Sequence, residues 1–311
     1  MTFIRGDGER GNSRRRCHGS AAALCVAALG FAATAGANTS NGYNLPPGVT
    51  DLSRDMYALH MEVFWICVGI AVVVFGAMIY SLVKFRKSQG AVPDTTMLHS
   101  TKVEIIWTVI PVVILVVMAI PAAELILKME DSRNSGLSVR VTGYQWKWEY
   151  QYMDAAEGID YFSTLARPSN FARELHSGVD PNTVENYLLD VDKPLVIPSG
   201  TKVRLLLTSD DVIHAWWVPD FGAKRSAIPG YVNELWFKVD AGKEGTYRGQ
   251  CAALCGRDHG FMPVVVTVLT PDDFKKWVAD QKAALKQPAA AGQESPATNA
   301  QPPRTAQAVP N

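Results

Sequence analysis

The residues best suited to chemistry in this chain gather in one short stretch, GQCAALCGRDHGFMP, at positions 249–263. Two of the five cysteines, Cys251 and Cys255, stand here beside His259 and Met262. Thiolate, imidazole and thioether groups are soft or borderline ligands for zinc and copper. In an oxidising compartment, however, two cysteines more often form a disulfide. The stretch therefore poses a choice between a metal site and a disulfide.

The mixture of ligand types favours copper over zinc. Zinc would accept two thiolates and two imidazoles, but a thioether is not a usual zinc ligand, so Met262 would remain unexplained. The spacing of Cys255, His259 and Met262 allows one loop to close round a copper ion with a thiolate, an imidazole and a weak axial sulfur, as in cupredoxin sites. A site of this kind needs a second histidine from elsewhere in the chain.

His214, in the segment TSDDVIHAWWVP, is the candidate for the second histidine. It follows a predicted strand and precedes Trp216 and Trp217, a dry setting that suits a ligand, although an ordinary buried histidine would give the same pattern. With His214 included, Cys251 is a surplus thiolate that could bridge two coppers. The other histidines lie in the N-terminal leader, beside the apolar segments or in a polar loop: His18, His60, His99 and His176.

Short β-strands are the elements that must position these ligands. From residue 131 onward, runs such as PLVIP, KVRLLLTS, ELWFKV, GTYRGQC and PVVVTVLT are separated by turns, which is typical of an all-β sandwich or barrel. The segment 137–152 also has a strand pattern, with alternating aromatic residues at Trp146, Trp148 and Tyr150. A helix is predicted after the N-cap residue Thr270.

Two apolar segments precede the β-region. Residues 63–83 and 105–123 carry no charged residue, and each is long enough to cross a membrane as a helix. We expect a two-helix hairpin. The connection at 84–103 has four basic residues against one acid, Asp94, so the positive-inside rule places it in the cytoplasm and the β-domain outside.

The ends of the chain have their own patterns. Three arginines, an apolar run and the small residues Ala35–Ala37 predict a secretory signal peptide at 1–37, with an uncleaved anchor helix as the alternative. Residues 287–311, rich in Ala, Pro and Gln, predict a disordered tail. The predicted organisation is a signal at 1–37, an anchor at 38–130, a β-domain at 131–286 and the tail. The 30 basic and 30 acidic residues cancel, which gives no indication of a nucleic-acid partner.

The pattern Cys-x3-Cys-x3-His-x2-Met, the upstream segment DVIHAWWVP and the segment AIPG at 227–230 resemble subunit II of the haem-copper cytochrome c oxidases, over roughly residues 52–282. The resemblance implies a membrane-anchored all-β protein with two transmembrane helices in a hairpin, followed by a cupredoxin-like Greek-key β-barrel that holds a binuclear copper A centre. It also implies the activity of a respiratory oxidase subunit, which accepts electrons from cytochrome c. These electrons pass to the haem of subunit I for oxygen reduction coupled to proton pumping.

The resemblance also implies the copper ligands. They would be the side chains of five residues and the backbone carbonyl of Ala253: His214, Cys251, Cys255, His259 and Met262. The family commonly has Glu at the position of Ala253, where the carboxylate reaches a magnesium ion. Because alanine offers no carboxylate, we do not expect magnesium among the cofactors. Haem is expected only in subunit I.

Two further residues take their expected roles from the same family. Trp146, in GYQWKWEY, matches the tryptophan that receives electrons under the cytochrome c docking surface. Glu104, which begins the second apolar segment, matches the glutamate at the mouth of a proton pathway of subunit I. Carboxylates would guide a basic cytochrome c to the surface, with these candidates: Asp190, Asp192, Asp210, Asp211 and Asp220.

The expected partners are oxidase subunits I and III, cytochrome c and membrane lipid. The expected location is a bacterial-type inner membrane, crossed more than once, with the copper domain on the periplasmic side. Two alternatives stay open. One is a quinol oxidase subunit II, which lacks the copper ligands. The other is a membrane-anchored β-domain with a Cys251–Cys255 disulfide that acts as a receptor or assembly factor.

Overall fold

The structure is a computed structural model that describes residues 44–92, 96 and 99–286. The predicted signal peptide at 1–37 and the predicted tail at 287–311 lie outside the described residues. All the elements below belong to one unit of the chain, Gly48–Asn311.

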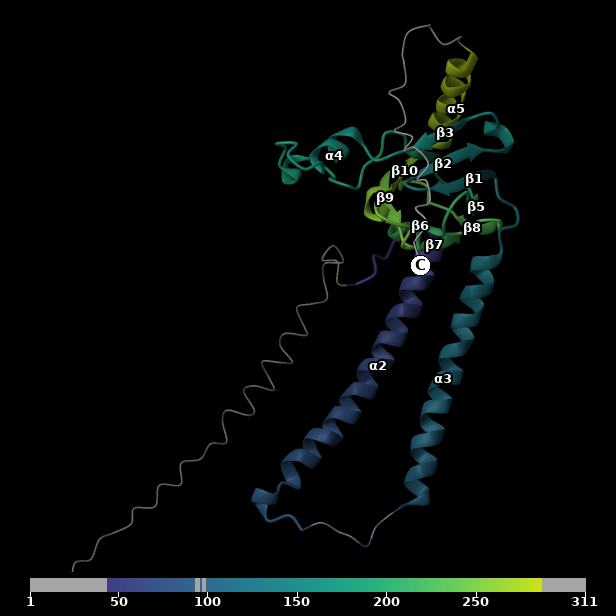
Figure 1. Cartoon of the computed structure of the whole chain (residues 1–311). Coiled ribbons are helices and arrows are strands. Elements are labelled where there is room, and N and C mark those ends of the chain that lie inside the picture. The colour runs from purple at the N-terminus through teal and green to yellow at the C-terminus, as the bar shows by residue number, and fades with distance from the viewer. Residues whose placement is uncertain (1–43, 93–95, 97–98, 287–311) are drawn as a thin grey trace, which may run out of the picture. The chain divides into compact units, whose positions relative to one another are not determined.

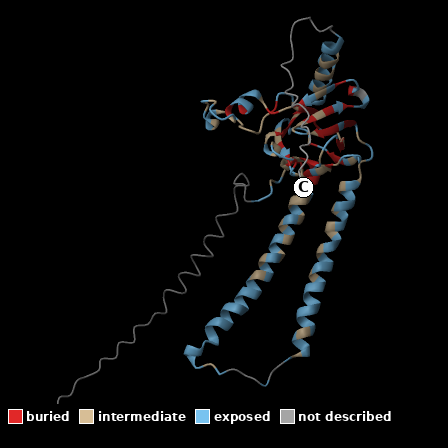
Figure 2. Ribbon diagram, viewed as in Figure 1, coloured by how far each residue is buried: buried red, intermediate tan, exposed pale blue. Residues whose placement is uncertain are grey.

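Two long helices, α2 (Asp51–Lys84) and α3 (Thr101–Glu130), contain the predicted apolar segments. Both are long and apolar enough to cross a membrane, and none of the most apolar 18-residue stretch of either helix is buried. Figure 2 shows this contrast, with exposed residues along both helices and buried residues concentrated in the β-domain. So large an exposed apolar surface requires a cover of lipid or protein.

Each of these helices is tied to the β-domain by hydrogen bonds. At the start of α2, Thr50 Oγ1 accepts from the backbone N–H of Ser53 (2.9 Å) and donates to the carbonyl of Phe221 (2.9 Å). At the end of α3, the indole N–H of Trp236 donates to the carbonyl of Lys128 (3.1 Å). The buried N-cap of α2 therefore contributes to the attachment of the anchor as well as to the helix itself.

The β-domain consists of two five-stranded sheets, with strand orders β3-β2-β1-β5-β8 and β4-β10-β9-β6-β7 (Figure 1). β1 pairs in parallel with β5 and β4 with β10, so the chain crosses between the sheets. The strands of the first sheet are β1 (Leu137–Tyr144), β2 (Lys147–Tyr152), β3 (Asp160–Ser163), β5 (Val203–Ser209) and β8 (Asn233–Phe237). Those of the second are β4 (Leu195–Pro198), β6 (His214–Val218), β7 (Ala223–Ala227), β9 (Gly245–Cys251) and β10 (Pro263–Leu269).

The remaining helices are short apart from the last. They are η2 (Lys87–Gln89), η3 (Asp154–Ala156), α4 (Arg167–Ala172), η4 (Pro181–Thr183), η5 (Pro219–Phe221), η6 (His259–Phe261) and α5 (Pro271–Lys286). The backbone N–H of Asp273 donates to Thr270 Oγ1 (3.2 Å), as expected for the predicted N-cap. Trp277 of α5 packs on the ring of Tyr152, with 5.3 Å between the ring centres.

The core between the sheets contains several large aromatic side chains among its aliphatic ones. Trp148, Tyr150 and Trp216 are fully buried. Trp216 stacks on Phe237 with 5.9 Å between the ring centres. Dense packing of large rings leaves little freedom for the strand ends that carry the candidate ligands.

The segment 137–152 is a hairpin rather than one strand, and this corrects the sequence-based interpretation. Tyr144 pairs with Lys147, so that Gln145 and Trp146 form a two-residue turn between β1 and β2. Trp146 is therefore half-buried at a turn, whereas Trp148 points into the core. The two strands of a hairpin have the same alternation of side chains, and a two-residue turn between them does not interrupt this alternation. The residue pattern alone therefore could not locate the turn.

Candidate metal centre

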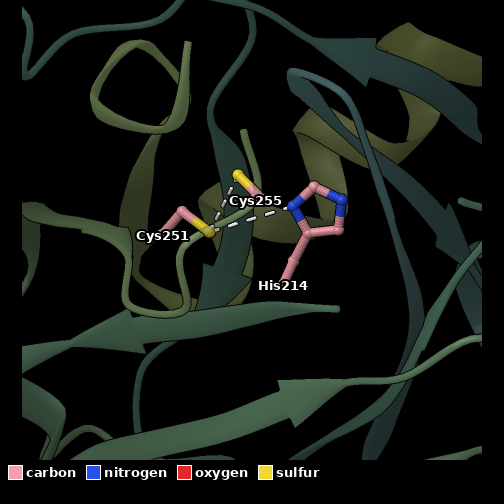
Figure 3. Close-up of side chains that lie close together, drawn as sticks. All are labelled: His214, Cys251 and Cys255. Atoms are coloured by element: carbon pink, nitrogen blue, oxygen red, sulfur yellow. Dashed lines mark hydrogen bonds between the residues drawn. The ribbon is translucent and has the colours of Figure 1, made fainter. Parts of the chain in front are cut away.

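The side chains of His214, Cys251 and Cys255 meet in the interior of the β-domain, with all three ligand atoms within 4.8 Å of one another. Figure 3 shows both sulfurs and the imidazole pointing toward one another. The Sγ atom of Cys251 lies 3.9 Å from Nδ1 of His214 and 3.9 Å from Sγ of Cys255. His214 is completely buried, and Cys251 and Cys255 are 6% and 3% exposed.

The other three predicted ligand atoms lie around the same two sulfurs. The Cys255 sulfur is 3.4 Å from Nδ1 of His259 and 3.5 Å from Sδ of Met262. The Cys251 sulfur is 3.4 Å from the carbonyl oxygen of Ala253. The cluster thus has two central sulfurs, and each has two further donor atoms beside it.

Strand pairing positions one part of this cluster. His214 is the first residue of β6, and Cys251 is the last residue of β9, which pairs with β6. The backbone N–H of Ala252 donates to the carbonyl of Ala215 (2.9 Å) just beyond the paired residues. The hydrogen bonds of one sheet therefore fix the distance between His214 and Cys251.

The separation of the two sulfurs excludes a disulfide in this structure. A disulfide bond is about 2.05 Å long, whereas the Cys251 and Cys255 sulfurs are 3.9 Å apart and both thiols are free.

The spacing of the donor atoms fits metal coordination. Tetrahedral ligands with metal bonds of about 2.0–2.3 Å lie about 3.3–3.8 Å from one another. The neighbouring donor atoms in the cluster are separated by 3.4 to 3.9 Å. The donor set of thiols, imidazoles, a thioether and a carbonyl suits copper better than a hard cation, which would select oxygen ligands.

The two thiols influence each other's ionisation. Burial works against a thiolate at Cys251, but contacts with His214 and with backbone groups outweigh burial and lower the pKa of Cys251 to about 7. Burial, and then the negative charge of Cys251, raise the pKa of Cys255 to about 12. Two adjacent buried thiolates repel each other, so a bound cation is needed before both cysteines can ionise near neutral pH.

Asp211 orients the imidazole of His214. The Nε2 atom of His214 is 2.9 Å from Oδ1 of Asp211, and a carboxylate can only accept a hydrogen bond. A neutral His214 therefore carries its proton on Nε2 and keeps the lone pair of Nδ1, the atom that faces Cys251. This is the usual arrangement of a metal-binding histidine with a carboxylate behind it.

Two other residues confine the same ring. The edge of Trp148 meets His214, with 5.8 Å between the ring centres. The backbone of Gly143 approaches the imidazole closely: a Cβ at this position would stand 2.8 Å from Cδ2 of His214. The ring therefore has little freedom to rotate away from the sulfurs.

Sequence reasoning missed the positioning role of Asp211 and treated it only as a docking candidate. The usable signal was its place three residues before a candidate histidine. The other carboxylates proposed for docking differ in burial. Asp220 is half-buried, and this burial raises its pKa, whereas Asp192 and Asp210 are exposed. Asp190 lies 3.9 Å from Arg248.

Trp146 and Glu104, the two predicted functional residues that are not copper ligands, lie in different parts of the structure. The indole N–H of Trp146 donates to the carbonyl of Cys255 (3.2 Å), and the guanidinium of Arg257 lies 5.5 Å from the centre of the Trp146 ring. The neighbouring Lys147 places its ammonium 3.9 Å from the centre of the Phe162 ring. Glu104 lies in the first turn of α3 and so belongs to the helical anchor.

Comparison with known proteins agrees with this architecture. The family model for the periplasmic domain of cytochrome c oxidase subunit II matches residues 137–269, and the model for its transmembrane domain matches residues 38–125. A probable cytochrome c oxidase subunit 2 from Rickettsia bellii is 37% identical over 235 residues, which cover 76% of this chain and 82% of the relative.

A more distant relative and a solved structure are also similar. Cytochrome c oxidase subunit 2 from Arabidopsis thaliana is 33% identical over 233 residues, which cover 75% of this chain and 86% of the relative. The crystal structure of the periplasmic domain of subunit II of cytochrome oxidase from Bradyrhizobium japonicum is 36% identical. It covers 49% of this chain and 98% of that chain, with a TM-score of 0.42.

The helix pair, the two sheets and the buried His–Cys–Cys cluster define a membrane-anchored subunit with a cupredoxin-like β-domain, and they confirm the predicted fold class. The chain belongs to the cytochrome c oxidase subunit II family. It is therefore a subunit of a copper-containing haem-copper oxidase, an oxidoreductase complex, and this membership implies association with subunit I.

The contact between Asp211 and His214 leads to a prediction for the metal-free chain. Burial lowers the tendency of His214 to be protonated, but Cys251 and Asp211 reverse this and raise the pKa of His214. Asp211→Asn removes the negative charge, so the pKa of His214 should fall. Proton NMR of the histidine-labelled chain would measure the change.

Asp210→Asn, one residue away and exposed, is the control and should leave the pKa of His214 unchanged. Equal pKa values of His214 in both variants would contradict the role of Asp211.

Proposed function

We propose that this subunit accepts electrons from cytochrome c at a binuclear copper A centre and passes them to the haem of subunit I. The oxidase then reduces oxygen and couples this reaction to proton pumping. The observation that carries the proposal is the pair of buried sulfurs, 3.9 Å apart, with four further donor atoms beside them. A one-copper site of the cupredoxin type would need one thiolate, two imidazoles and a thioether, and it would leave the thiolate of Cys251 unused.

The proposed ligands are the side chains of His214, Cys251, Cys255, His259 and Met262 and the carbonyl of Ala253. When bound by these residues, a copper pair would supply a one-electron carrier. The protein holds the ligands in nearly fixed positions through the β6–β9 pairing, the Asp211 hydrogen bond and the aromatic core. A rigid, buried site needs little rearrangement when its charge changes, and this favours rapid electron transfer.

Copper analysis of the purified full-length chain tests this proposal. We expect two copper ions per chain and an electron paramagnetic resonance signal of one unpaired electron shared by both. Cys251→Ser should abolish the shared signal, because one of the two sulfurs that would hold the copper pair is lost. A single zinc ion, or a Cys251–Cys255 disulfide in the chain purified after copper loading, would contradict the proposal.

Trp146 is proposed as the residue that receives the electron from cytochrome c. Its indole N–H is hydrogen-bonded to the carbonyl of Cys255, so a short covalent and hydrogen-bonded path leads from the half-exposed ring to a proposed ligand. The contact with Arg257 covers part of the ring, but Trp146 keeps an exposed fraction that a partner can meet.

Replacing Trp146 by alanine should slow electron transfer from cytochrome c to copper by about an order of magnitude or more, measured on chains that are fully loaded with copper. Flash-induced reduction of bound cytochrome c would measure this step. Trp277→Ala removes a tryptophan of α5 instead and should leave the rate unchanged. Equal rates for the wild type and Trp146→Ala would refute this role.

Glu104 is proposed to stand at the mouth of a proton pathway of subunit I. A carboxylate in the first turn of α3 is favoured by the helix dipole and by nearby water, and it can exchange protons at the cytoplasmic boundary. In the assembled oxidase, Glu104→Gln should slow turnover several-fold with a normal copper signal. Glu124→Gln, near the other end of α3, is the control; if both variants turn over like the wild type, Glu104 has no such role.

The proposed setting is a bacterial-type inner membrane that is crossed by α2 and α3, with residues 131–286 on the periplasmic side. The proposed partners are subunits I and III, cytochrome c and lipid. The basic connection between the helices and the apolar exposed faces of α2 and α3 support this arrangement. Because Ala253 has no carboxylate, no magnesium site is proposed.

A further inference from the structure

The pairing of β6 with β9 fixes His214 relative to Cys251, but it does not reach Cys255. Cys255 lies four residues beyond the end of β9, in a loop without strand pairing. Its sulfur must nevertheless remain between those of Cys251 and Met262 for the cluster to persist. Another contact has to hold this part of the loop.

The β1–β2 turn provides that contact. The carbonyl of Cys255 accepts two hydrogen bonds from the turn, one from the side-chain amide of Gln145 (2.8 Å) and one from the indole of Trp146 (3.2 Å). The approach is close: a Cβ on Gly256 would stand 2.9 Å from Nε2 of Gln145, and Gly256 has a φ of +113° that favours glycine.

The same turn also reaches the histidine side of the cluster. The backbone N–H of Gln145 donates to Oδ2 of Asp211 (2.6 Å), and the other oxygen of Asp211 is 2.9 Å from Nε2 of His214. Gln145 therefore contacts both halves of the site, through its backbone on the His214 side and through its side chain on the Cys255 side.

We propose that Gln145 is a positioning residue that holds the Cys255 loop against the His214 half of the metal centre. This inference rests on the proposed function. The hydrogen bonds of Gln145 reach none of the proposed ligand atoms. It acts instead through the backbone carbonyl of Cys255 and the carboxylate of Asp211. Loss of its amide would let the Cys255 backbone move and would change the geometry at the sulfur of Cys255.

This role differs from that of a surface residue that only meets cytochrome c. Gln145 is exposed, so a docking role alone would change the KM for cytochrome c and leave the copper centre as it is. A positioning role changes the spectrum and the copper affinity whether or not cytochrome c is present. Loss of a hydrogen-bonding residue behind a metal ligand typically weakens metal binding by about 10-fold to 100-fold.

The experiment uses the full-length chain loaded with copper, with two variants of Gln145. Gln145→Met keeps the length of the side chain but cannot donate, and Gln145→Glu replaces the donor by a carboxylate that repels the Cys255 carbonyl. In both variants the backbone N–H still reaches Asp211. Lys147→Met, in the same hairpin but with its ammonium over Phe162, is the matched control. Circular dichroism verifies that all variants fold.

We expect both Gln145 variants to lose copper to a competing chelator at least about 10-fold more readily than the wild type. We also expect an altered visible spectrum and paramagnetic hyperfine pattern, with Lys147→Met unchanged. If the wild type has the two-copper signal and both Gln145 variants match it in spectrum and copper retention, the positioning role is overturned even if KM changes. If the wild type has no two-copper signal, the proposed function fails, and this role with it.

Discussion

The repulsion between two buried sulfurs is the constraint on which the rest of the site depends. Cys251 and Cys255 lie 3.9 Å apart in a nearly dry interior, where a second negative charge is strongly opposed. A disulfide would relieve this repulsion by a covalent bond, but both thiols are free and their sulfurs are farther apart than a disulfide bond length. A soft cation bound to both sulfurs would relieve the same repulsion, and the other donor atoms could bind this cation as well. The protein thus keeps a costly arrangement that a metal pair can stabilise.

The surroundings of the cluster make this arrangement persistent. His214 is held by a carboxylate, by the edge of Trp148 and by a glycine that allows close contact, while the Cys255 carbonyl accepts two hydrogen bonds from the β1–β2 turn. These supports belong to strands β1 and β2 of the first sheet, their turn and the loop after β5, whereas His214 and Cys255 belong to the second sheet and its loop, so the packing of the two sheets also keeps the site together. The residue proposed to receive electrons, Trp146, is one of these supports, and structural and electronic roles therefore coincide in one side chain.

The anchor and the β-domain meet different requirements of one chain. The helices α2 and α3 satisfy their backbone hydrogen bonds internally and expose apolar side chains, as membrane spans must. The β-domain buries its apolar residues and presents polar ones. Contacts of Thr50 with Phe221 and of Trp236 with Lys128 tie the two parts together. The subunit II family is divided in the same way, into a transmembrane domain and a periplasmic domain.

The sequence by itself determined the fold class, the two apolar helices and the grouping of soft ligands in one loop, because hydrophobic runs and ligand spacing are local properties. It predicted His214 as a partner of that loop only through residue type and family resemblance. Tertiary structure decided that His214 meets the sulfurs, because β6 pairs with β9, and that Gln145 and Trp146 form a turn over Cys255. Only the structure also shows that Asp211 contacts Nε2 of His214, on the side of the ring away from the sulfurs. Contacts of this kind join residues from distant strands, and neither composition nor spacing along the chain encodes which strands become neighbours.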